Sequence, residues 1–366
     1  MQIVIFFILS LYILLIIRYK IGWHLVNPPI KKHIKPFVSV VIALRDEENN
    51  VSTLLKSLQS QNYCESSIEF ILVNDHSKDR TLSILKKSNL KNLIVIDLND
   101  NEYGKKMAIK KAVNLANGEV ILASDADCCF NINWVSSMVA YFEHSETQLV
   151  SGPVVYKDQK GIFQKLQSLE FISLVTSGAG SIGINNAIFC NGANMAYRKK
   201  AFIDLNDFED NLSPSGDDVF LLHSIKSKKN NSIIFAKEQD AIVTTEGQPN
   251  FNLFINQRKR WASKSTLYTD FASSYVSYLV FLTNLTLVIL SIISFFSWSF
   301  FIIFLSFYII KFLVDFLLLF SVLKFFKRLY LTRYIFPFEL IYSYYIVIIV
   351  GLSFFNPFEW KGRIYR

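Results

Sequence analysis

Two acidic residues separated by one position mark the first place where this chain could do chemistry. The stretch Ser124-Asp125-Ala126-Asp127 directly follows the apolar run 120–123. Alternate residues that leave a strand can bring two carboxylates close to one point, and Mg²⁺ and Mn²⁺ prefer oxygen ligands of this kind. Asp125 and Asp127 are therefore candidate ligands of a divalent metal that also holds the phosphates of a substrate. The pair alone is weak evidence, because this spacing is common.

Two further acidic stretches also follow apolar runs, at residues 45–49 (RDEEN) and 74–81 (NDHSKDRT). An acidic residue at a helix start is ordinary, because it can accept hydrogen bonds from the first N–H groups of the helix. For Asp79 this structural role stays open. Three acidic stretches, each at the end of an apolar run, are harder to explain by capping and indicate a binding site.

The segments that carry these residues alternate between two hydrophobic patterns. Runs rich in β-branched residues predict strands, and apolar residues recurring every three or four positions predict helices. The predicted strands are 37–44, 68–73, 93–98 and 120–123, and the predicted helices are 47–61, 79–87 and 105–115. This order predicts an α/β fold with a mostly parallel, doubly wound sheet, in which ligands bind at the carboxyl ends of the strands.

The composition shows that such a sheet is only part of the chain. Of 366 residues, 51% are hydrophobic and 19% are charged, which excludes a disordered chain. Long apolar stretches occur at 3–17, 275–320 and 334–355, and lengths of about 20 residues suit membrane-spanning helices. The predicted divisions are a transmembrane helix (1–20), the α/β domain (36–272), two transmembrane helices (273–322), a third transmembrane or re-entrant segment (334–355) and a basic tail (356–366).

Basic residues beside the apolar stretches indicate how the chain is oriented. They follow the first stretch at Arg18, Lys20, Lys31, Lys32 and Lys35. Since cytoplasmic flanks of membrane helices carry more Lys and Arg, the α/β domain is predicted to be cytoplasmic. A cleaved signal peptide is the alternative for 3–17. One span before the domain and three after it would place the basic tail outside, so either the last segment re-enters or one segment is misread.

The net charge of +8 could also indicate nucleic-acid binding. Much of the positive charge, however, lies beside the apolar stretches, and the sequence contains no zinc-finger spacing or RNA-binding signature. We therefore expect the lipid bilayer, and no nucleic acid, as a partner.

Two features allow both a functional and a structural interpretation. Lys311 and Asp315 lie one helical turn apart in an apolar stretch, where charge is costly. They either have a function or neutralise each other. A helix predicted over 160–177 has a broad apolar face, which either lies on the bilayer and delivers a lipid acceptor or packs on the domain core.

Seven segments in order along the chain together resemble the membrane-integrated family 2 glycosyltransferases of the GT-A fold. They are VSVVIALRDEENNV, VNDHSKDRT, YGKKMAIKKAV, SDAD, CNGANMAYRKKAF, SGDDVFLLHSI and QRKRW. In turn they resemble the opening strand and nucleotide-binding turn, the second turn, the Gly-Lys segment, the metal motif, the acceptor-side Gly-x-Asn segment, the general-base motif and Gln-x-x-Arg-Trp. The ending WKGR is similar to the tail of ceramide-glucosyltransferase-like and bacterial lipid glycosyltransferases.

This resemblance implies a role for each matching residue. The implied donor-binding residues are Arg45, Glu47, Asp75, Lys105, Lys106, Asp125 and Arg260. The implied acceptor-binding residues are Gly192, Asn194, Gln257 and Trp261. Asp127, with Asp125, would hold Mg²⁺ or Mn²⁺, and Asp218 would be the general base.

The sequence departs from the family pattern at two positions and leaves one role open. His76 stands where the second turn usually has Gly, and Asp217 stands where Glu usually precedes the base. The Asp217–Asp218 pair leaves open which carboxylate takes the proton, with Asp218 preferred because it matches the second position of the motif. Trp261 could instead anchor the chain at the membrane interface.

The resemblance implies an inverting enzyme that moves a sugar from a nucleotide-sugar, expected to be a UDP-sugar, to a membrane lipid acceptor. A carboxylate that takes the proton of the acceptor hydroxyl contributes roughly 10²–10⁴ in rate. The alternative within this class is a processive polysaccharide synthase, although the membrane part is small for a polymer channel. A transporter or binding protein would explain the spans but not the acidic rim. The expected location is the bacterial inner membrane, with the α/β domain in the cytoplasm.

Overall fold

Buried β-branched runs pair side by side, as their pattern predicts. The computed structural model describes residues 2–29, 35–205, 217–355, 358–360 and 363–365. Its main sheet has seven strands in the order β3-β2-β1-β4-β7-β5-β8. The strands are β1 (Val38–Leu44), β2 (Ile68–Asn74), β3 (Leu93–Asp97), β4 (Val120–Asp125), β5 (Leu149–Ser151), β7 (Met195–Arg198) and β8 (Ile233–Phe235).

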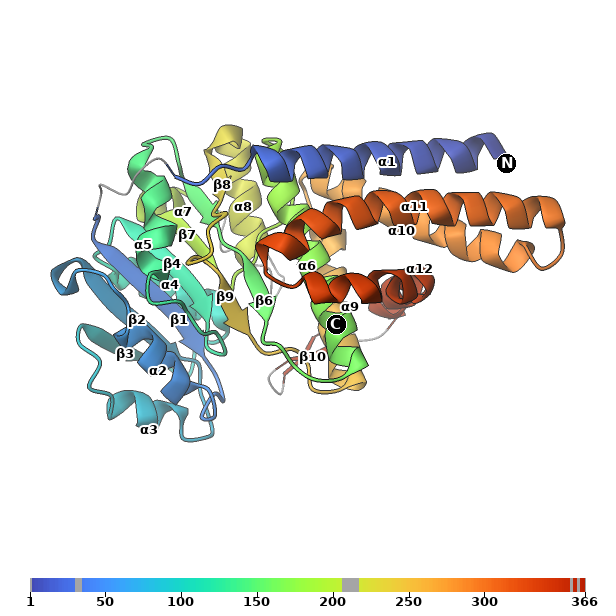
Figure 1. Ribbon diagram of the computed structural model, residues 1–366. Helices are drawn as coiled ribbons and strands as arrows, with labels where there is room; N and C mark the ends of the chain where they lie inside the picture. The colour runs from blue at the N-terminus through green and yellow to red at the C-terminus, as the bar shows by residue number, and fades with distance from the viewer. Residues whose placement is uncertain (1, 30–34, 206–216, 356–357, 361–362, 366) are drawn as a thin grey trace. The chain divides into compact units, whose positions relative to one another are not determined.

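The pairing in this sheet confirms the prediction of a mostly parallel α/β fold. Strands β3, β2, β1 and β4 run parallel, and so do β5 and β8, whereas β7 is antiparallel to both of its neighbours. Two short strands, β6 (Val154–Tyr156) and β9 (Val243–Thr245), form a second parallel pair. The carboxyl ends of β1, β2 and β4 therefore lie at one edge of the sheet, which is drawn in blue to green in Figure 1.

Helices in the same part of the chain accompany these strands, and the first three of them correspond to the predicted helices. They are α2 (Val51–Gln59), α3 (Thr81–Lys86), α4 (Lys105–Leu115), α5 (Trp134–Val139), α7 (Lys199–Ile203) and α8 (Asp217–Lys228). Helix α4 has the predicted bounds. Helix α2 begins four residues later than predicted, because residues 47–50 form a turn in which the N–H groups of Asn50 and Val51 donate to the carbonyl of Glu47.

The chain divides into two compact units, each described here by itself. Residues 26–157 and 185–246 form the first, which we call the sheet unit, and residues 1–25, 158–184 and 247–366 form the second, the helical unit. Residues 158–184 and 247–272, which were predicted to belong to the α/β domain, thus group with the apolar helices. The helical unit also includes the hairpin of β10 (Phe358–Trp360) and β11 (Arg363–Tyr365).

The helical unit contains six long helices. They are α1 (Gln2–Leu25), α6 (Ile162–Gly183), α9 (Phe251–Lys264), α10 (Phe271–Ile293), α11 (Trp298–Phe325) and α12 (Ile335–Phe355). Within the described residues, α1, α10, α11 and a segment that includes α12 are long and apolar enough to cross a membrane. Helix α1 continues five residues past its predicted end, since Tyr19 and Trp23 are buried in the unit beyond the basic residues.

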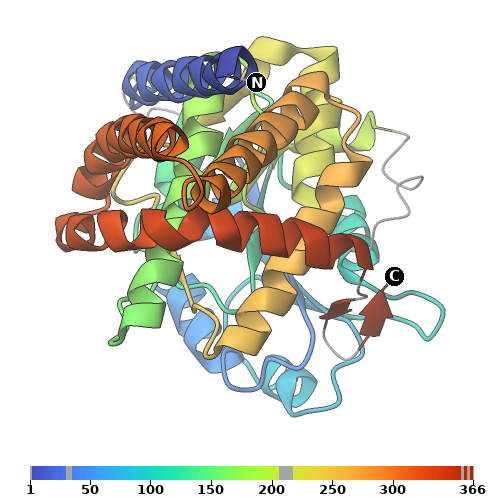
Figure 2. The same cartoon turned by 90° about the vertical axis from the view of Figure 1, so that its right-hand side faces the viewer.

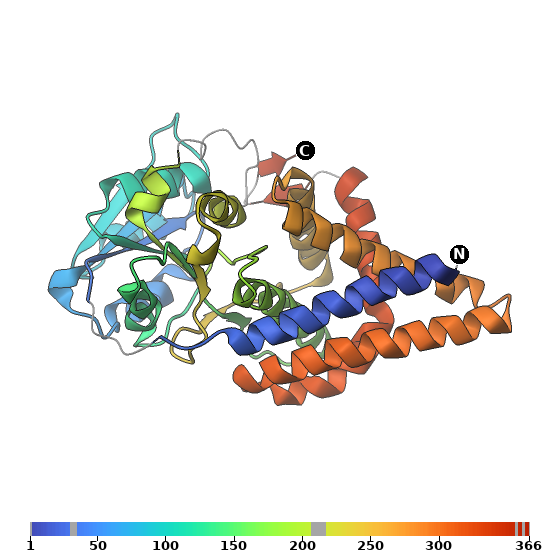
Figure 3. The ribbon, with the colours of Figure 1, turned by 90° about the horizontal axis from the view of Figure 1, so that it is seen from above.

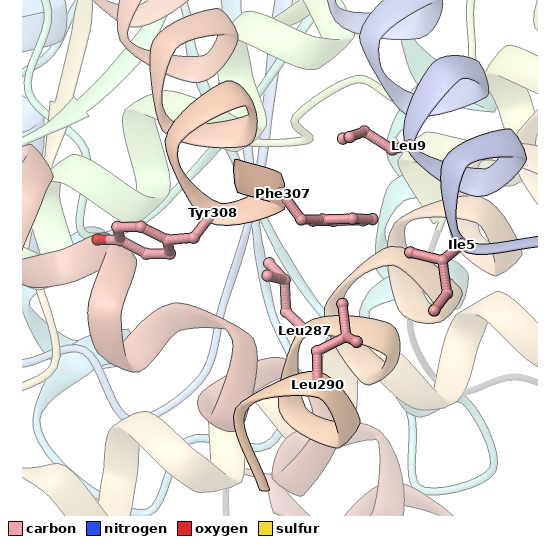
Figure 4. Packing of buried hydrophobic residues seen from close by; sticks show 6 residues of the cluster. All are labelled: Ile5, Leu9, Leu287, Leu290, Phe307 and Tyr308. Atoms are coloured by element: carbon pink, nitrogen blue, oxygen red, sulfur yellow. The ribbon is translucent and has the colours of Figure 1, made fainter. Parts of the chain in front are cut away.

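Helices α1, α10 and α11 run alongside one another (Figures 1 and 3). Side chains from all three point toward one another in Figure 4 and form a buried cluster. Its members are Ile5, Leu9, Leu287, Leu290, Phe307 and Tyr308. Helix α12 instead lies across this bundle, as the two views in Figures 2 and 3 show.

A close crossing of glycines joins α6 to α1. A Cβ atom on Gly22 would lie 2.0 Å from the carbonyl oxygen of Gly180, and one on Gly183 would lie 2.0 Å from the carbonyl oxygen of Gly22. Small residues allow helix backbones to approach this closely. The helix predicted over 160–177 spans Ile162–Gly183 and packs on α1, a contact that neither of the two interpretations from sequence included.

A buried ionic cluster joins α1, α11 and α12. Lys311 has no exposed surface, and its Nζ lies 2.8 Å from Oδ2 of Asp315 and also contacts the carboxylate of Glu339. The hydroxyl of Tyr12 donates to both carboxylate oxygens of Asp315, at 2.9 and 3.0 Å. These contacts support the structural interpretation of the Lys311–Asp315 pair, and they add two partners that the sequence pattern did not identify.

Candidate active site

Two loops interlock at the carboxyl ends of β1 and β2. The N–H of Asp46 donates to Oγ of Ser77 (3.0 Å), and the N–H of Lys78 donates to Oδ1 of Asp46 (2.7 Å). Asp46 and His76 both have positive φ, at 52° and 56°. His76 therefore adopts the left-handed conformation that glycine takes most easily, so the substitution of His for Gly at this turn leaves a left-handed backbone in place.

Asp75 is the buried residue of this edge, and Arg45 lies beside it. Nη1 of Arg45 donates to the carbonyl oxygen of Asp75 (3.0 Å). The Asp75 carboxylate accepts from the N–H of Gly104 (3.1 Å) and lies 3.0 Å from Nδ1 of His76. The structure thus brings together two of the predicted donor-binding residues, Arg45 and Asp75.

Asp79 has the structural role that the sequence left open. Its carboxylate accepts from the N–H of Thr81 (2.9 Å) and from the N–H of Glu48 (2.9 Å), so it ties the β2 loop to the β1 loop. Burial alone would raise the pKa of Asp79, but these hydrogen bonds outweigh it and hold that pKa below its usual value.

Carboxylates converge where β4 ends. Asp125 is the last residue of β4, and its Oδ1 lies 2.7 Å from Nζ of Lys105, at the start of α4. Burial raises the pKa of Asp127 to about 6, and the neighbouring carboxylates of Asp125 and Glu47 add to this effect. Asp125, Asp127 and Glu47 therefore act on one another electrostatically.

This donor set fits a divalent cation that shares its coordination with a substrate. Hard oxygen ligands suit Mg²⁺ and Mn²⁺, and both ions keep positions for phosphate oxygens. The residues that the structure describes contain no group of three or more His, Cys, Asp and Glu side chains arranged to hold a metal ion. An ion at Asp125 and Asp127 would thus take the rest of its ligands from substrate or water.

A second carboxylate, Asp218, is held beside Gly192. Oδ2 of Asp218 accepts from the N–H of Gly192 (3.0 Å), and Oδ1 accepts from the N–H of Val219 (2.9 Å). A Cβ atom on Gly192 would lie 3.3 Å from this carboxylate, which explains a glycine here. The next residue, Ala193, accepts from Oγ of Ser124 (2.7 Å), so the Gly192 turn is tied to β4. Asp217 begins α8, and its side chain lies outside the described residues.

The two lysines of the Gly-Lys segment point to different neighbours. Lys105 pairs with Asp125, whereas Nζ of Lys106 lies 5.4 Å from the ring centroid of Phe220 on α8. Lys105 is therefore the one that contacts the acidic residues at the end of β4.

Asn194 departs from its expected role as an acceptor-binding residue. Its side chain is fully buried, and its Oδ1 accepts from Nε1 of Trp134 (2.9 Å). Its Nδ2 donates to the carbonyl oxygens of Pro153 (2.9 Å) and Ala241 (2.8 Å). The amide is thus used in holding protein segments together, and its contacts are those of a structural residue.

The remaining predicted residues lie on α9 in the helical unit. Gln257, Arg260 and Trp261 share this helix with Arg258, which no prediction included. Arg258 is buried, and its guanidinium forms an ion pair with Glu170 of α6. Glu170 is the one acidic residue of α6 and is flanked by apolar residues on both sides, which was the available signal.

Comparisons with known proteins agree with this fold. Residues 39–205 match the family described as glycosyl transferase family 2. Glycosyltransferase AglE from Haloferax volcanii is 24% identical over 185 residues, which cover 50% of this chain and 59% of that protein. Poly-beta-1,6-N-acetyl-D-glucosamine synthase from Staphylococcus aureus is 23% identical over 178 residues, covering 48% and 42%. The match thus spans about half the length of these curated relatives.

One solved structure is similar over almost the whole chain. It is the mannosyltransferase PcManGT from Pyrobaculum calidifontis, solved in complex with GDP-Man and Mn²⁺, with a TM-score of 0.60 and 13% identity over 97% of this chain and 96% of that one. An identity this low supports the fold alone. Residues 39–205 are therefore similar to a family 2 glycosyltransferase domain, and the chain has the GT-A fold with apolar helices at both ends.

Proposed function

We propose that this enzyme transfers one sugar from a nucleotide-sugar to a lipid acceptor in the membrane, with inversion at the anomeric carbon. The observation that carries the proposal is the position of Asp125 and Asp127 at the carboxyl end of β4, where Lys105 contacts Asp125, in the same unit as the anchored carboxylate of Asp218. In α/β sheets ligands bind at this edge. The nucleotide-sugar and Mn²⁺ in the mannosyltransferase complex are consistent with such a site.

Asp127 and Asp125 would hold Mg²⁺ or Mn²⁺ against the donor diphosphate. A bound ion of this kind supplies a Lewis acid that stabilises the charge of the leaving diphosphate. Lys105 orients Asp125 through their hydrogen bond, and Arg45 and Asp75 lie at the neighbouring strand ends, where the nucleoside would bind. The resemblance favours uridine as the base, and GDP in the mannosyltransferase complex makes guanosine the alternative to test.

Asp218 would take the proton of the acceptor hydroxyl. The hydroxyl oxygen forms a bond to the anomeric carbon while the bond from that carbon to the diphosphate oxygen breaks, and the proton moves to the Asp218 carboxylate. The N–H groups of Gly192 and Val219 fix this carboxylate in one orientation. Arg260 would add charge-assisted hydrogen bonds to the diphosphate.

The apolar helices support a lipid as the acceptor. A membrane lipid presents its headgroup at the bilayer surface, where a transferase with flanking apolar helices can reach it. The similarity to a poly-N-acetylglucosamine synthase favours a second candidate, a processive enzyme that extends a polysaccharide.

We further propose that α1, α10 and α11 cross the bilayer and that α12 lies along its cytoplasmic side. Helix α12 lies across the other three in Figures 2 and 3, and its exposed side is apolar at Phe336, Leu340, Tyr344 and Ile348. Three crossings would leave both the sheet unit and the basic tail in the cytoplasm, which removes the conflict in counting spans. A reporter fused to the C-terminus that is active only in the periplasm should be inactive, and activity there would contradict this topology.

The function is tested by donor turnover in membranes that contain extracted lipids. Asp218→Asn should lower transfer by roughly 10²–10⁴ while donor binding persists, because only the base is lost. Glu143→Gln, an equivalent change at an exposed residue of the sheet unit, serves as the control and should leave transfer unchanged. Product analysis separates a single-sugar glycolipid from a long polymer. Wild-type activity in Asp218→Asn would overturn the proposal.

A further inference from the structure

Arg258 lies at the centre of a set of side chains that includes Gln257 and Trp261, two of the acceptor-binding residues that the family resemblance implies. Its side chain is 2% exposed. Its Nε donates to both carboxylate oxygens of Glu170, at 2.9 and 3.1 Å, and its Nη2 also contacts that carboxylate. The guanidinium lies 4.2 Å from the ring centroid of Trp261 and 4.5 Å from that of Phe254.

The contact between Arg258 and Gln257 determines how the Gln257 amide is turned. Nη1 of Arg258 donates to Oε1 of Gln257. A guanidinium has five N–H donors and no acceptor, so the amide oxygen has to face it. The NH₂ group of Gln257 therefore points away from Arg258 and presents donors to a ligand with oxygen acceptors, such as a hydroxyl or a phosphate.

Glu170 connects this arrangement to two other helices. Its carboxylate sits on α6, and the hydroxyl of Tyr345 on α12 donates to its Oε1 (3.1 Å). The ring of Tyr345 also stacks on Phe254 of α9, with centroids 5.7 Å apart. The ring centroid of Phe171, the residue next to Glu170, lies 6.0 Å from that of Trp261. Side chains of α6 and α12 thus hold one face of α9.

We propose that Arg258 is a positioning residue of the transferase, which orients Gln257 and Trp261 for the acceptor through its ion pair with Glu170. This inference rests on the proposed function, because it takes Gln257 and Trp261 as acceptor residues. Lys in place of Arg258 would keep the charge but lose the planar fork that reaches Glu170 and Gln257 together.

The closing experiment separates positioning from folding. Removing one partner of a buried ion pair leaves an uncompensated charge, whereas replacing both partners with apolar residues of similar volume often preserves stability. Three variants are compared: Arg258→Met, Arg258→Lys and the double variant Glu170→Leu with Arg258→Met. Arg333→Met, an exposed change in the same unit, is the control.

The double variant should fold and retain wild-type KM for the donor, while KM for the acceptor rises by about 10- to 100-fold, since small displacements of positioned groups cost rates of this size. Arg258→Lys should show the same acceptor defect. Tyr345→Phe, which removes one hydrogen bond to Glu170, should show a smaller one. Wild-type acceptor KM in the folded double variant would overturn the inference and leave the pair a structural one.

A second readout keeps this test independent of the proposed function. Trp261 fluorescence, obtained as the difference from Trp261→Phe, should shift in the double variant because the guanidinium no longer covers the indole. If wild-type protein transfers no sugar, the proposed function fails while this shift still reports on positioning. If the enzyme is active and the Trp261 signal is unchanged, the positioning role of Arg258 is contradicted and the proposed function is not affected.

Discussion

Carboxylates gather in both units of this protein, and their surroundings differ. In the helical unit, Asp315 and Glu339 surround the fully buried Lys311, and Tyr12 donates to Asp315. In the sheet unit, the carboxylates of Asp125 and Glu47, together with burial, raise the pKa of Asp127 to about 6. The first cluster buries its cation between its carboxylates, whereas in the second Lys105 contacts Asp125, and the carboxylates of Asp125 and Glu47 still act against ionisation of Asp127.

This difference separates a structural cluster from a binding site. Charges buried in an apolar unit are tolerated when partners compensate them, and such a cluster holds helices in register. Mutual repulsion among carboxylates costs stability and is relieved when a cation binds. The carboxylates near Asp127 therefore favour the binding of a cation from outside the protein. In the helical unit, Lys311 already compensates the carboxylates.

The largest effect is expected at Lys311. Lys311→Met leaves the buried carboxylate of Glu339 and the partly buried carboxylate of Asp315 without their cation and should lower the free energy of unfolding by about 3–5 kcal/mol. Thermal unfolding of the detergent-solubilised protein measures it. Adding Asp315→Asn and Glu339→Gln to this variant should recover most of the loss, because the charge that lacked compensation is then removed. No recovery would show that the cluster stabilises by packing instead.

Asp127→Asn, in contrast to Lys311→Met, should lower activity without lowering stability. Transfer should fall at least about 10²-fold, since a metal contributes several kcal/mol of transition-state stabilisation. The metal-free protein should be as stable as the wild type or more so, because repulsion with Asp125 and Glu47 is relieved. Donor turnover with Mn²⁺ measures the first effect, and thermal unfolding without metal measures the second. A loss of stability as large as that of Lys311→Met would contradict the interpretation that Asp127 belongs to a binding site and not to a structural cluster.

Glu69 offers a third case, a buried carboxylate satisfied by hydrogen bonds instead of a cation. It accepts from Oγ of Ser39 (2.5 Å) and from the N–H of Asn117 (2.6 Å). Burial would raise the pKa of Glu69, but these hydrogen bonds outweigh it and lower that pKa below its usual value.

Glu69→Gln should therefore cost about 1–2 kcal/mol at pH 7, where the wild-type carboxylate is ionised. The folded pKa is lowered, so this stability is fully present above the unfolded pKa and is lost as the pH falls through the folded one. Denaturant unfolding of both proteins from pH 7 down to pH 3 should show the difference shrinking in the acid range. A difference independent of pH would mean that shape, not charge, matters at this position.

Local pattern accounts for much of the sheet unit. The β-branched runs became β1 to β4, and α4 has the predicted bounds, because strand and helix periodicity follow from neighbouring residues alone. Helix α2 starts later than its apolar pattern, since the turn at residues 47–50 is set by hydrogen bonds that the pattern does not contain. Local pattern could not predict the contacts of Asn194 either, because its partners Trp134, Pro153 and Ala241 lie 41 to 60 positions away.

Short windows of the chain encode the α/β sheet, the apolar segments and the residue types that follow the strands. Which charges meet depends on how distant segments pack. Glu339 joins Lys311 across 28 positions, and Glu170 joins Arg258 across 88. Electrostatic partners are chosen by distance in space and by exclusion of water, and neither quantity exists until the helices have packed.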